Sequence, residues 1–467
     1  MERERQFSKL KSTATPHEAA REFLYSEGYL KNGLYEIKNY KGQFFIYYGT
    51  HYKATTNNNM LLEVIRFLQD QPDLGEKTKT HFAKEVLTNI AAIVMIPDDI
   101  EIPCLLGGAT NNSSHFISMK NGIFDLDRYL KGKNPLLPHN PNFFSLNSLK
   151  FSYSPKATCP KWKKLINEIL PDLDVQNAFQ EWVGYGLTND TSFHKFVLMV
   201  GAGANGKSIA CTVMRALYGK ENTSGVGLEQ LNPTRTFPLT GMLGKTANIV
   251  EEIGDVDKVA EDILKIIVGG GELSVEKKGQ DPFLMKFKTK LTFATNVVPR
   301  FRDRSDGLWR RIIFLPFIIQ TLDPKKQNKN FVDEYWWIKS GEIEGILNWA
   351  LEGLLSLLNR GHFLEPKASL DMKEEYKAEA NPAVTFLLEN YMIKVSGNTC
   401  SEQLYRQYSD CVKEHGGKPL GKSHFTREVK RVFPQARLSR HPKATKVRDN
   451  SNFVRRSRIW ENIKVRK

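Results

Sequence analysis

Residues 196–208 read FVLMVGAGANGKS and decide how the rest of the chain is interpreted. Five apolar residues, 196–200, form a continuous run of the length typical of a buried parallel strand. The run leads directly into G-x-x-x-x-G-K-S, in which glycines let backbone N–H groups converge on phosphates. Lys207 can reach the β- and γ-phosphate oxygens, and Ser208 can place its hydroxyl on Mg²⁺ at a helix N-terminus. The stretch therefore predicts a P-loop between a strand and a helix.

The alternative interpretation is a glycine-rich turn in a purely structural strand–helix unit. The complete pattern is rare by chance, because glycine makes up only about 7% of residues and the motif fixes four positions. A strand before the motif and a helix after it make coincidence rarer still. We therefore expect the loop residues to contact a nucleotide. They are Gly201, Ala202, Gly203, Ala204, Asn205, Gly206, Lys207 and Ser208.

The composition restricts the class of protein. A chain of 467 residues, 40% of them hydrophobic, can bury more than one core, so several domains are expected. The 5 cysteines show neither metal-ligand spacing nor a secreted disulfide framework, which argues for a reducing compartment and against zinc. No stretch reaches the roughly 18 uninterrupted apolar residues of a membrane span. We expect a soluble, intracellular protein with no membrane partner.

Positive charge is concentrated near the C-terminus. The formal net charge is +15, and residues 381–467 contain 19 Lys and Arg against 7 Asp and Glu. Excess lysine usually reflects a solvated surface, but such a surface does not usually concentrate its charge in one segment. A polyanionic partner for this segment is therefore the favoured interpretation.

Two segments precede the P-loop strand. Residues 1–110 combine a helix signal at 13–25 with aromatic runs separated by turns, which is typical of a small α+β accessory domain. Its aromatic side chains are expected in the core rather than stacked on nucleic-acid bases, and they include Phe44, Phe45, Tyr47 and Tyr48. Residues 111–190 contain an Asn121–Gly122 hairpin signal and then apolar residues at helical spacing, so we expect a helical domain there.

A second short strand, expected at 247–250, ends in the acids Glu251 and Glu252. They stand at its carboxyl end, where open α/β sheets bring ligands together. One carboxylate can hold Mg²⁺ through water while the other polarises the attacking water. Paired acids are common on surfaces, but within the domain of a P-loop they favour a catalytic role.

A hairpin and a further strand follow in the order of the chain. Residues 272–290 read as a hairpin whose tip carries Lys277 and Lys278, either a grip on a phosphate backbone or an ordinary solvated turn. A strand at 291–295 ends in Asn296, a polar side chain that can sense a γ-phosphate or its attacking water.

Arg310 and Arg311 immediately precede another buried strand, IIFLPF. They are either charges that flank the strand or guanidiniums that stabilise transition-state charge from a neighbouring subunit.

The order of these motifs resembles a known family. GAGANGKS, NIVEEIGD, the hairpin GGGELSVEKKGQDPF, KLTFATN and DRSDGLWRRIIFLPF are similar to the motifs of superfamily 3 helicases, in the phage, plasmid and poxvirus primase-helicase branch. NGIFDL, CPKW and FQEWVGYGLT resemble the helical domain that precedes the helicase core in that branch. The resemblance covers residues 118–330 strongly and the flanks weakly.

This resemblance implies an α/β fold with an AAA+-like P-loop NTPase core in residues 191–360, which uses ATP and Mg²⁺. Lys207 and Ser208 would be the Walker A residues, and Glu251 with Ser208 would hold the Mg²⁺. Glu252 would polarise water. The further roles that it implies are Asn296 as sensor, Arg310 or Arg311 as an arginine finger in trans, and Lys277 and Lys278 as lysines that grip DNA in the channel of a hexamer.

Residues 361–467 fit the basic winged-helix domain that the family leads us to expect. The patterns SEQLYRQYSDCVKEH and KSHFTREVKRVF predict two helices, followed by basic, strand-like segments. Four basic residues on or near the second helix are expected to contact DNA, namely Lys422, Arg427, Lys430 and Arg431. The alternative is a packing module with a generally basic surface.

The motifs and the family resemblance together imply a hexameric, ATP-dependent DNA helicase for the replication of a phage, plasmid or other mobile element, in the cytoplasm of a bacterium or a virus-infected host cell. Residues 1–110 look too short for a primase domain and show no acidic catalytic triad, so a separate primase or polymerase is a candidate partner. A replication initiator or loader that hydrolyses ATP without unwinding DNA is the alternative. A small-molecule P-loop kinase is disfavoured by the basic C-terminal segment and by the set of motifs.

Overall fold

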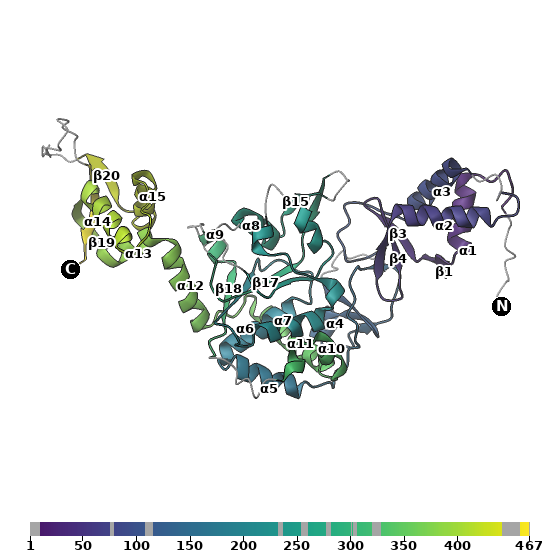
Figure 1. The fold of residues 1–467 in the computed structure, drawn as a ribbon, viewed down its shortest axis with the longest axis horizontal. Coiled ribbons are helices and arrows are strands. Elements are labelled where there is room, and N and C mark those ends of the chain that lie inside the picture. Colours follow the sequence, from purple (N-terminus) through teal and green to yellow (C-terminus); the bar gives the residue numbers. More distant parts are fainter. Residues whose placement is uncertain are drawn as a thin grey trace. The chain divides into compact units, whose positions relative to one another are not determined.

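A computed structural model describes residues 10–74, 79–107, 115–231, 237–253, 260–276, 282–299, 301, 306–319, 328–440 and 458–466. These residues fall into two compact units (Figure 1). The second unit comprises residues from Leu370 onward with the described parts of 257–261 and 298–310, and the first comprises the remainder. Among the described residues, no helix has the length and apolar character needed to cross a membrane.

The N-terminal part of the first unit packs three helices on a small sheet of strand order β5-β4-β3-β6. Its first helix, α1 (Pro16–Ser26), begins with a capping box in which Thr15 and Glu18 exchange hydrogen bonds. Phe44 and Phe45 are buried as expected, but Tyr48 lies beyond the end of its strand and is 58% exposed. The other elements are β1 (Leu30–Lys31), β2 (Leu34–Tyr35), β3 (Ile37–Tyr40), β4 (Gln43–Tyr47), β5 (Tyr52–Thr55), α2 (Asn57–Gln69), α3 (Thr80–Ile93) and β6 (Met95–Ile96).

The segment between this sheet and the P-loop strand is only partly helical. The predicted hairpin is present, because β8 (Phe116–Met119) pairs with β9 (Gly122–Asp125) around the Asn121–Gly122 turn. A Cβ on Gly122 would lie 2.6 Å from the carbonyl oxygen of Leu137, so the turn needs glycine. The remaining elements are β7 (Cys104–Leu105), α4 (Leu126–Leu130), β10 (Leu136–Leu137), β11 (Phe143–Phe144), α5 (Pro160–Ile169) and α6 (Leu173–Tyr185).

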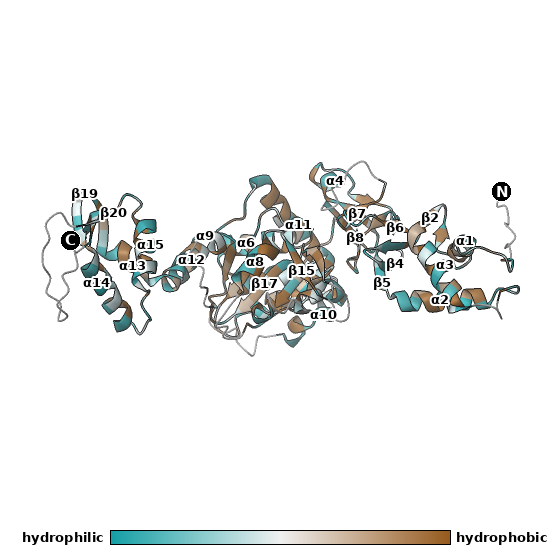
Figure 2. Ribbon diagram, turned by 90° about the horizontal axis from the view of Figure 1, so that it is seen from above, coloured by the Kyte–Doolittle hydropathy of each residue, from teal (hydrophilic) through white to brown (hydrophobic). Residues whose placement is uncertain are grey.

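A five-stranded sheet forms the centre of the first unit, with strand order β13-β14-β17-β12-β18 and every neighbouring pair parallel. The strands β12, β17 and β18 are buried along their whole length, which explains the continuous apolar sequences of β12 and β18. Figure 2 shows β17 largely in the hydrophobic colour. The bounds are β12 (Phe196–Val200), β13 (Thr223–Ser224), β14 (Ala247–Val250), β17 (Lys290–Thr295) and β18 (Ile312–Pro316).

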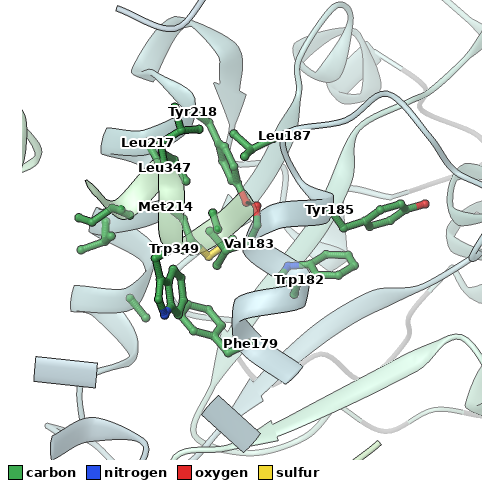
Figure 3. Packing of buried hydrophobic residues seen from close by; sticks show 14 of the residues in the cluster. Phe179, Trp182, Val183, Tyr185, Leu187, Met214, Leu217, Tyr218, Leu347 and Trp349 are labelled. Atoms are coloured by element: carbon green, nitrogen blue, oxygen red, sulfur yellow. Dashed lines mark hydrogen bonds between the residues drawn. The ribbon is translucent and has the colours of Figure 1, made fainter. Parts of the chain in front are cut away.

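Helices α6, α7 (Lys207–Tyr218) and α11 (Ile343–Arg360) contribute to one hydrophobic cluster with this sheet. In Figure 3, Phe179 of α6 lies against Trp349 of α11, and their ring centroids are 6.2 Å apart. Trp182 of α6 and Met214 of α7 belong to the same cluster. The indole N–H of Trp182 also donates a hydrogen bond of 2.8 Å to the hydroxyl of Thr292 in β17. Helix α6, which lies before the P-loop, therefore shares one hydrophobic cluster with the sheet that carries the P-loop.

The hairpin expected after the acid-bearing strand β14 is also present. Strands β15 (Glu272–Val275) and β16 (Phe283–Lys286) are antiparallel. Its tip, with Lys277 and Lys278, lies outside the described residues. The other short helices are α8 (Glu261–Val268), α9 (Asp306–Trp309), α10 (Glu334–Lys339), η3 (Lys220–Asn222), η4 (Leu228–Gln230), η5 (Phe237–Met242) and η6 (Lys329–Val332).

The second unit packs three helices against a three-stranded antiparallel sheet of order β19-β21-β20. The two predicted helices are present as α14 (Ser401–Glu414) and α15 (Lys422–Val432). The strand β19, which lies before α14, was not predicted. The other bounds are α12 (Lys367–Ala380), which begins in the first unit, α13 (Pro382–Asn390), β19 (Tyr391–Cys400), β20 (Arg437–Arg440) and β21 (Arg458–Val465).

Candidate active site

The glycines of the P-loop permit very close backbone contacts. A Cβ on Gly201 would lie 2.2 Å from the carbonyl oxygen of Phe317, which follows β18. Gly206 has a φ of 96°, and a Cβ there would lie 2.6 Å from the side chain of Ile169 at the end of α5. The loop between β12 and α7 therefore has room for no larger residue at either position.

Asn205 fixes the loop to the neighbouring strand. Its side chain is 1% exposed, and its amide nitrogen donates a hydrogen bond of 2.7 Å to the carbonyl oxygen of Phe317. Its amide oxygen accepts from Lys207 at 3.0 Å. Sequence reasoning placed Asn205 in the loop but assigned it no partner, because Phe317 lies 112 residues away.

Lys207 is buried at the start of α7, and its ammonium group is surrounded by oxygen atoms. It lies 2.6 Å from the carbonyl oxygen of Gly201 and 2.9 Å from that of Ala202. The side-chain oxygen of Asn296, at the carboxyl end of β17, lies 3.1 Å away. Burial lowers the pKa of Lys207, while Cys211 and Glu252 act in the opposite direction. The structure thus brings the predicted Walker A lysine and the predicted sensor together.

The two acids after β14 have different surroundings. The carboxylate of Glu251 forms an ion pair with Arg215 of α7. The Nε of Arg215 donates a hydrogen bond of 2.7 Å to Glu334, the first residue of α10. Burial lowers the pKa of Arg215, but the two carboxylates outweigh it and raise that pKa overall. Glu252 is exposed, and its charge is the one that acts on Lys207.

Sequence reasoning missed Arg215 and Glu334. Arg215 lies eight residues after Lys207 on the same helix, and Glu334 lies 119 residues beyond Arg215. No spacing rule links residues so far apart. The one available signal was an arginine in the mainly apolar part of the helix that follows the P-loop.

The residues of this site fit a nucleoside triphosphate and Mg²⁺. The α7 N-terminus has no side-chain cap, since its N-cap residue is Gly206, and its first turn carries the exposed hydroxyl-bearing Ser208. Uncapped N–H groups at a helix N-terminus suit a phosphate group. The described part of the chain contains no group of three or more His, Cys, Asp and Glu side chains that could hold a metal alone. Mg²⁺ commonly takes only one or two protein carboxylates in addition to phosphate oxygens, and Glu251 and Glu252 can provide these.

Arg310 and Arg311 lie in different units of the structure. Arg310 is exposed, and its N–H donates to the carbonyl oxygen of Asp306 at 3.1 Å. Arg311 is half-buried, and its carbonyl oxygen accepts from the N–H of Phe196 at the start of β12. Arg311 is therefore tied by its backbone to the P-loop strand.

The four basic residues predicted on the second C-terminal helix all lie on α15 and are exposed. The opposite face of α15 buries Phe425 and Val429 in the core of the second unit. Two of the basic side chains have acidic partners: Lys422 pairs with Glu402, and Arg431 lies 3.5 Å from Glu428. The helix thus presents a basic outer face.

Comparison with protein families gives two matches. Residues 29–171 match the family described as D5 N terminal like, and residues 199–311 match a family of unknown function (DUF5906). The first match spans both the N-terminal sheet and α5, and the second contains the P-loop, both acids and Asn296.

Curated relatives of the chain include viral proteins that are named as putative helicases. A protein of Acanthamoeba polyphaga mimivirus is 21% identical over 90% of this chain and 47% of its own length. A protein of Invertebrate iridescent virus 3 is 24% identical over 59% of this chain and 32% of its own length. The chain therefore spans about half the length, or less, of these relatives.

Solved structures with a similar fold include the apo C-terminal region of NrS-1. One form matches with a TM-score of 0.53 and 10% identity, over 97% of this chain and 100% of that one. A second form matches with a TM-score of 0.51 over 95% and 98%. The fold, the D5-type segment and the viral relatives agree with the family resemblance of the motifs. Together they support a relationship of the chain to proteins of the phage and viral primase-helicase type.

Proposed function

We propose that the chain is an ATP-dependent DNA helicase that translocates as a hexameric ring during replication of a phage, plasmid or other mobile element. The observation that carries this proposal is the contact of 3.1 Å between Lys207 and Asn296. This contact joins the P-loop to the end of β17. The strand on the other side of β17 is β14, which is followed by Glu251 and Glu252. A loop that cradles phosphates thus stands beside groups able to polarise water.

The core is proposed to be an AAA+-like P-loop NTPase. In its parallel sheet, β17 with Asn296 lies between the P-loop strand β12 and the acid-bearing strand β14. Ligands bind at the carboxyl ends of such strands, so the three sets of polar residues share one edge of the sheet. This arrangement supports a domain that includes residues 191–360, with residues 1–110 and 111–190 before it and 361–467 after it.

Within this core, each side chain has a proposed task. The P-loop backbone and Lys207 bind the phosphates of ATP, Ser208 and Glu251 hold Mg²⁺, and Glu252 orients and polarises the attacking water. Bound Mg²⁺ would supply charge neutralisation for the leaving phosphate. Asn296 contacts Lys207 in this structure. Its amide can contact a γ-phosphate or water when ATP is bound. Its position supports the sensor role.

The exposure of Arg310 supports an arginine finger in trans. A guanidinium from a neighbouring subunit can stabilise the negative charge of the transition state. The subunit that binds ATP then needs no arginine of its own near the P-loop for this task. Arg310 is exposed, whereas Arg311 is half-buried at the start of β18. We assign the finger to this pair and expect the ring to complete each ATP site.

DNA is proposed to contact two parts of the chain. In the second unit the order α13, β19, α14, α15, β20, β21 supports a winged-helix domain, with α15 as the helix that meets DNA. Its exposed residues Lys422, Arg427, Lys430 and Arg431 suit phosphates or base edges. The β15–β16 hairpin, whose tip carries Lys277 and Lys278, is proposed to grip the single strand in the channel.

A second candidate function shares the same observations. The basic face of α15 also suits a replication initiator or loader that hydrolyses ATP without unwinding DNA. Either protein would act in the cytoplasm of a bacterium or a virus-infected cell, with a separate primase or polymerase as a candidate partner. Strand displacement on a forked duplex tests the proposal, because ATP hydrolysis stimulated by DNA without displacement supports the loader instead.

A further inference from the structure

We propose that Arg215 is a positioning residue that holds Glu251 in place for the nucleotide reaction and is itself anchored by Glu334. This inference rests on the proposed ATPase function. Among the described residues, Arg215 pairs with these two acids rather than with the P-loop or the proposed water-polarising acid Glu252. Its action on the reaction would therefore pass through Glu251.

The guanidinium of Arg215 uses two different nitrogen atoms for its two acids. Nη2 pairs with Glu251, and Nε donates to Glu334 at 2.7 Å. The guanidinium is planar and rigid, so fixing one edge on Glu334 also fixes the direction of the other. Glu251 is thereby held in one orientation by Arg215, which is itself anchored to Glu334 on α10.

The anchor belongs to a well-packed helix. Glu334 is the first residue of α10, which Asp333 caps through the N–H of Tyr335. Trp337 of the same helix is fully buried in the main core, and its indole N–H donates to the carbonyl oxygen of Phe331 at 2.9 Å. Because α10 is held by this packing, Glu334 can restrain Arg215 more strongly than a side chain on a free surface could.

Burial favours a real contribution from this cluster. The side chain of Arg215 is 19% exposed, that of Glu334 29% and that of Glu251 42%, whereas isolated ion pairs between fully solvated side chains contribute little. One guanidinium between two carboxylates has a formal charge of −1, so the cluster still attracts a cation. Arg215 can therefore orient Glu251 without cancelling the negative charge of the site.

The two acids then have separate restraints. Glu251 is tied to α7 and α10 through Arg215, while Glu252 lies outside that cluster and its charge acts on Lys207. Loss of Arg215 would remove the ion pair that restrains the side chain of Glu251. Mutation of a residue that orients a metal ligand typically lowers activity or metal affinity by about 10–100-fold.

The test is a double-mutant cycle with Arg215→Gln, Glu251→Gln and the double variant. The first readout is urea unfolding of the nucleotide-free protein, in which the effects of the two substitutions should be non-additive. The second is steady-state ATP hydrolysis. Arg215→Gln should lower kcat by about 10–100-fold with little change in KM for ATP, and should have no further effect in a Glu251→Gln background.

Further variants separate positioning from general stability. Glu334→Gln should reproduce part of the loss in kcat, and Arg215→Lys should not restore it, because an ammonium lacks the fork geometry. Lys150→Gln is the matched control, since it breaks an exposed ion pair of 2.9 Å with Glu221 away from the site, and it should leave kcat unchanged.

The positioning role is overturned if Arg215→Gln lowers kcat as strongly in the Glu251→Gln background as in the wild type. It is also overturned if the unfolding effects are strictly additive. Failure of the proposed function looks different: the wild type would not hydrolyse ATP at all, while unfolding would still report the coupling between Arg215 and Glu251. The two failures are therefore distinguishable.

Discussion

The ammonium group of Lys207 lies 3.1 Å from the side-chain oxygen of Asn296, although 89 residues separate the two in the chain. The parallel pairing of β12 with β17 produces this contact, because the two strands end at the same edge of the sheet. Lys207 also contacts the carbonyl oxygens of Gly201 and Ala202. A nucleotide that binds here must therefore offer the lysine better acceptors than the loop already does.

Replacing Lys207 with Ala should abolish ATP hydrolysis and leave the fold intact. The charge that meets the phosphates is lost, and removal of one such donor costs about 10²–10³-fold in kcat. Steady-state hydrolysis gives the rate, and far-UV circular dichroism checks the fold. Turnover near the wild-type rate would mean that the P-loop is misassigned.

Replacing Asn296 with Ala should affect catalysis more than binding. Its amide lies at the edge of the site and is exposed, so its loss should lower kcat by about 10–100-fold and change KM less. Binding of a fluorescent ATP analogue measures affinity separately. A large loss of affinity with unchanged kcat would contradict a sensor role.

Arg310→Ala and Arg311→Ala should differ in stability as well as activity. Because Arg310 is exposed and Arg311 half-buried, only Arg311→Ala should lower the melting temperature appreciably. The finger variant should lose ATP hydrolysis and regain part of it when mixed with Lys207→Ala subunits, which supply an intact arginine. A monomer with full activity would refute action in trans.

Removing the basic side chains of α15 should weaken the binding of DNA whatever the DNA sequence. Substituting Lys422, Arg427, Lys430 and Arg431 with Gln should reduce the slope of log affinity against log salt by about 1 for each DNA phosphate that is no longer neutralised. The matched control replaces the exposed Lys163 and Lys164 of α5, which should leave the slope unchanged. An unchanged slope for the α15 variant would place the DNA-binding surface elsewhere.

Lys290 should make stability depend on pH. It is fully buried in β17, and desolvation lowers its pKa to about 7 although its Nζ donates to the carbonyl oxygens of Thr188 and Lys288. The unfolded chain therefore binds this proton more tightly than the folded chain between pH 7 and about 10.5. Stability should rise with pH across that window, by up to about 1.4 kcal/mol per pH unit.

The Lys290→Met variant lacks the titrating ammonium group. Its free energy of unfolding should therefore not show this rise with pH. Urea denaturation of both proteins at pH 7 and pH 9 measures the difference. Equal slopes in the two proteins would show that Lys290 stays protonated in the folded chain.

The sequence predicted local features better than contacts between distant elements. The P-loop strand, the hairpin at Asn121–Gly122 and helices α14 and α15 follow from short patterns, and all are present. The strand β19 was missed because YMIKVSGN lacks a clear alternation, and its pairing partner β21 lies more than fifty residues on.

Contacts within the site depend on the sheet order, which no short pattern encodes. Asn296 could be named from its place after an apolar strand, but its contact with Lys207 requires β17 beside β12. Arg215 and Glu334 had no motif at all. The packing of α6 on α11 is likewise not encoded by a short pattern, because it depends on a close approach at a glycine: a Cβ on Gly184 would lie 2.1 Å from the carbonyl oxygen of Ala350.

Strand displacement on a forked DNA duplex tests the central claim most directly. The wild-type protein with ATP and Mg²⁺ should release the labelled strand, and the Lys207→Ala variant should not. Measurement of particle size in the same samples should show a hexamer. Hydrolysis of ATP that DNA stimulates, without release of the strand by the wild type, would contradict the helicase proposal.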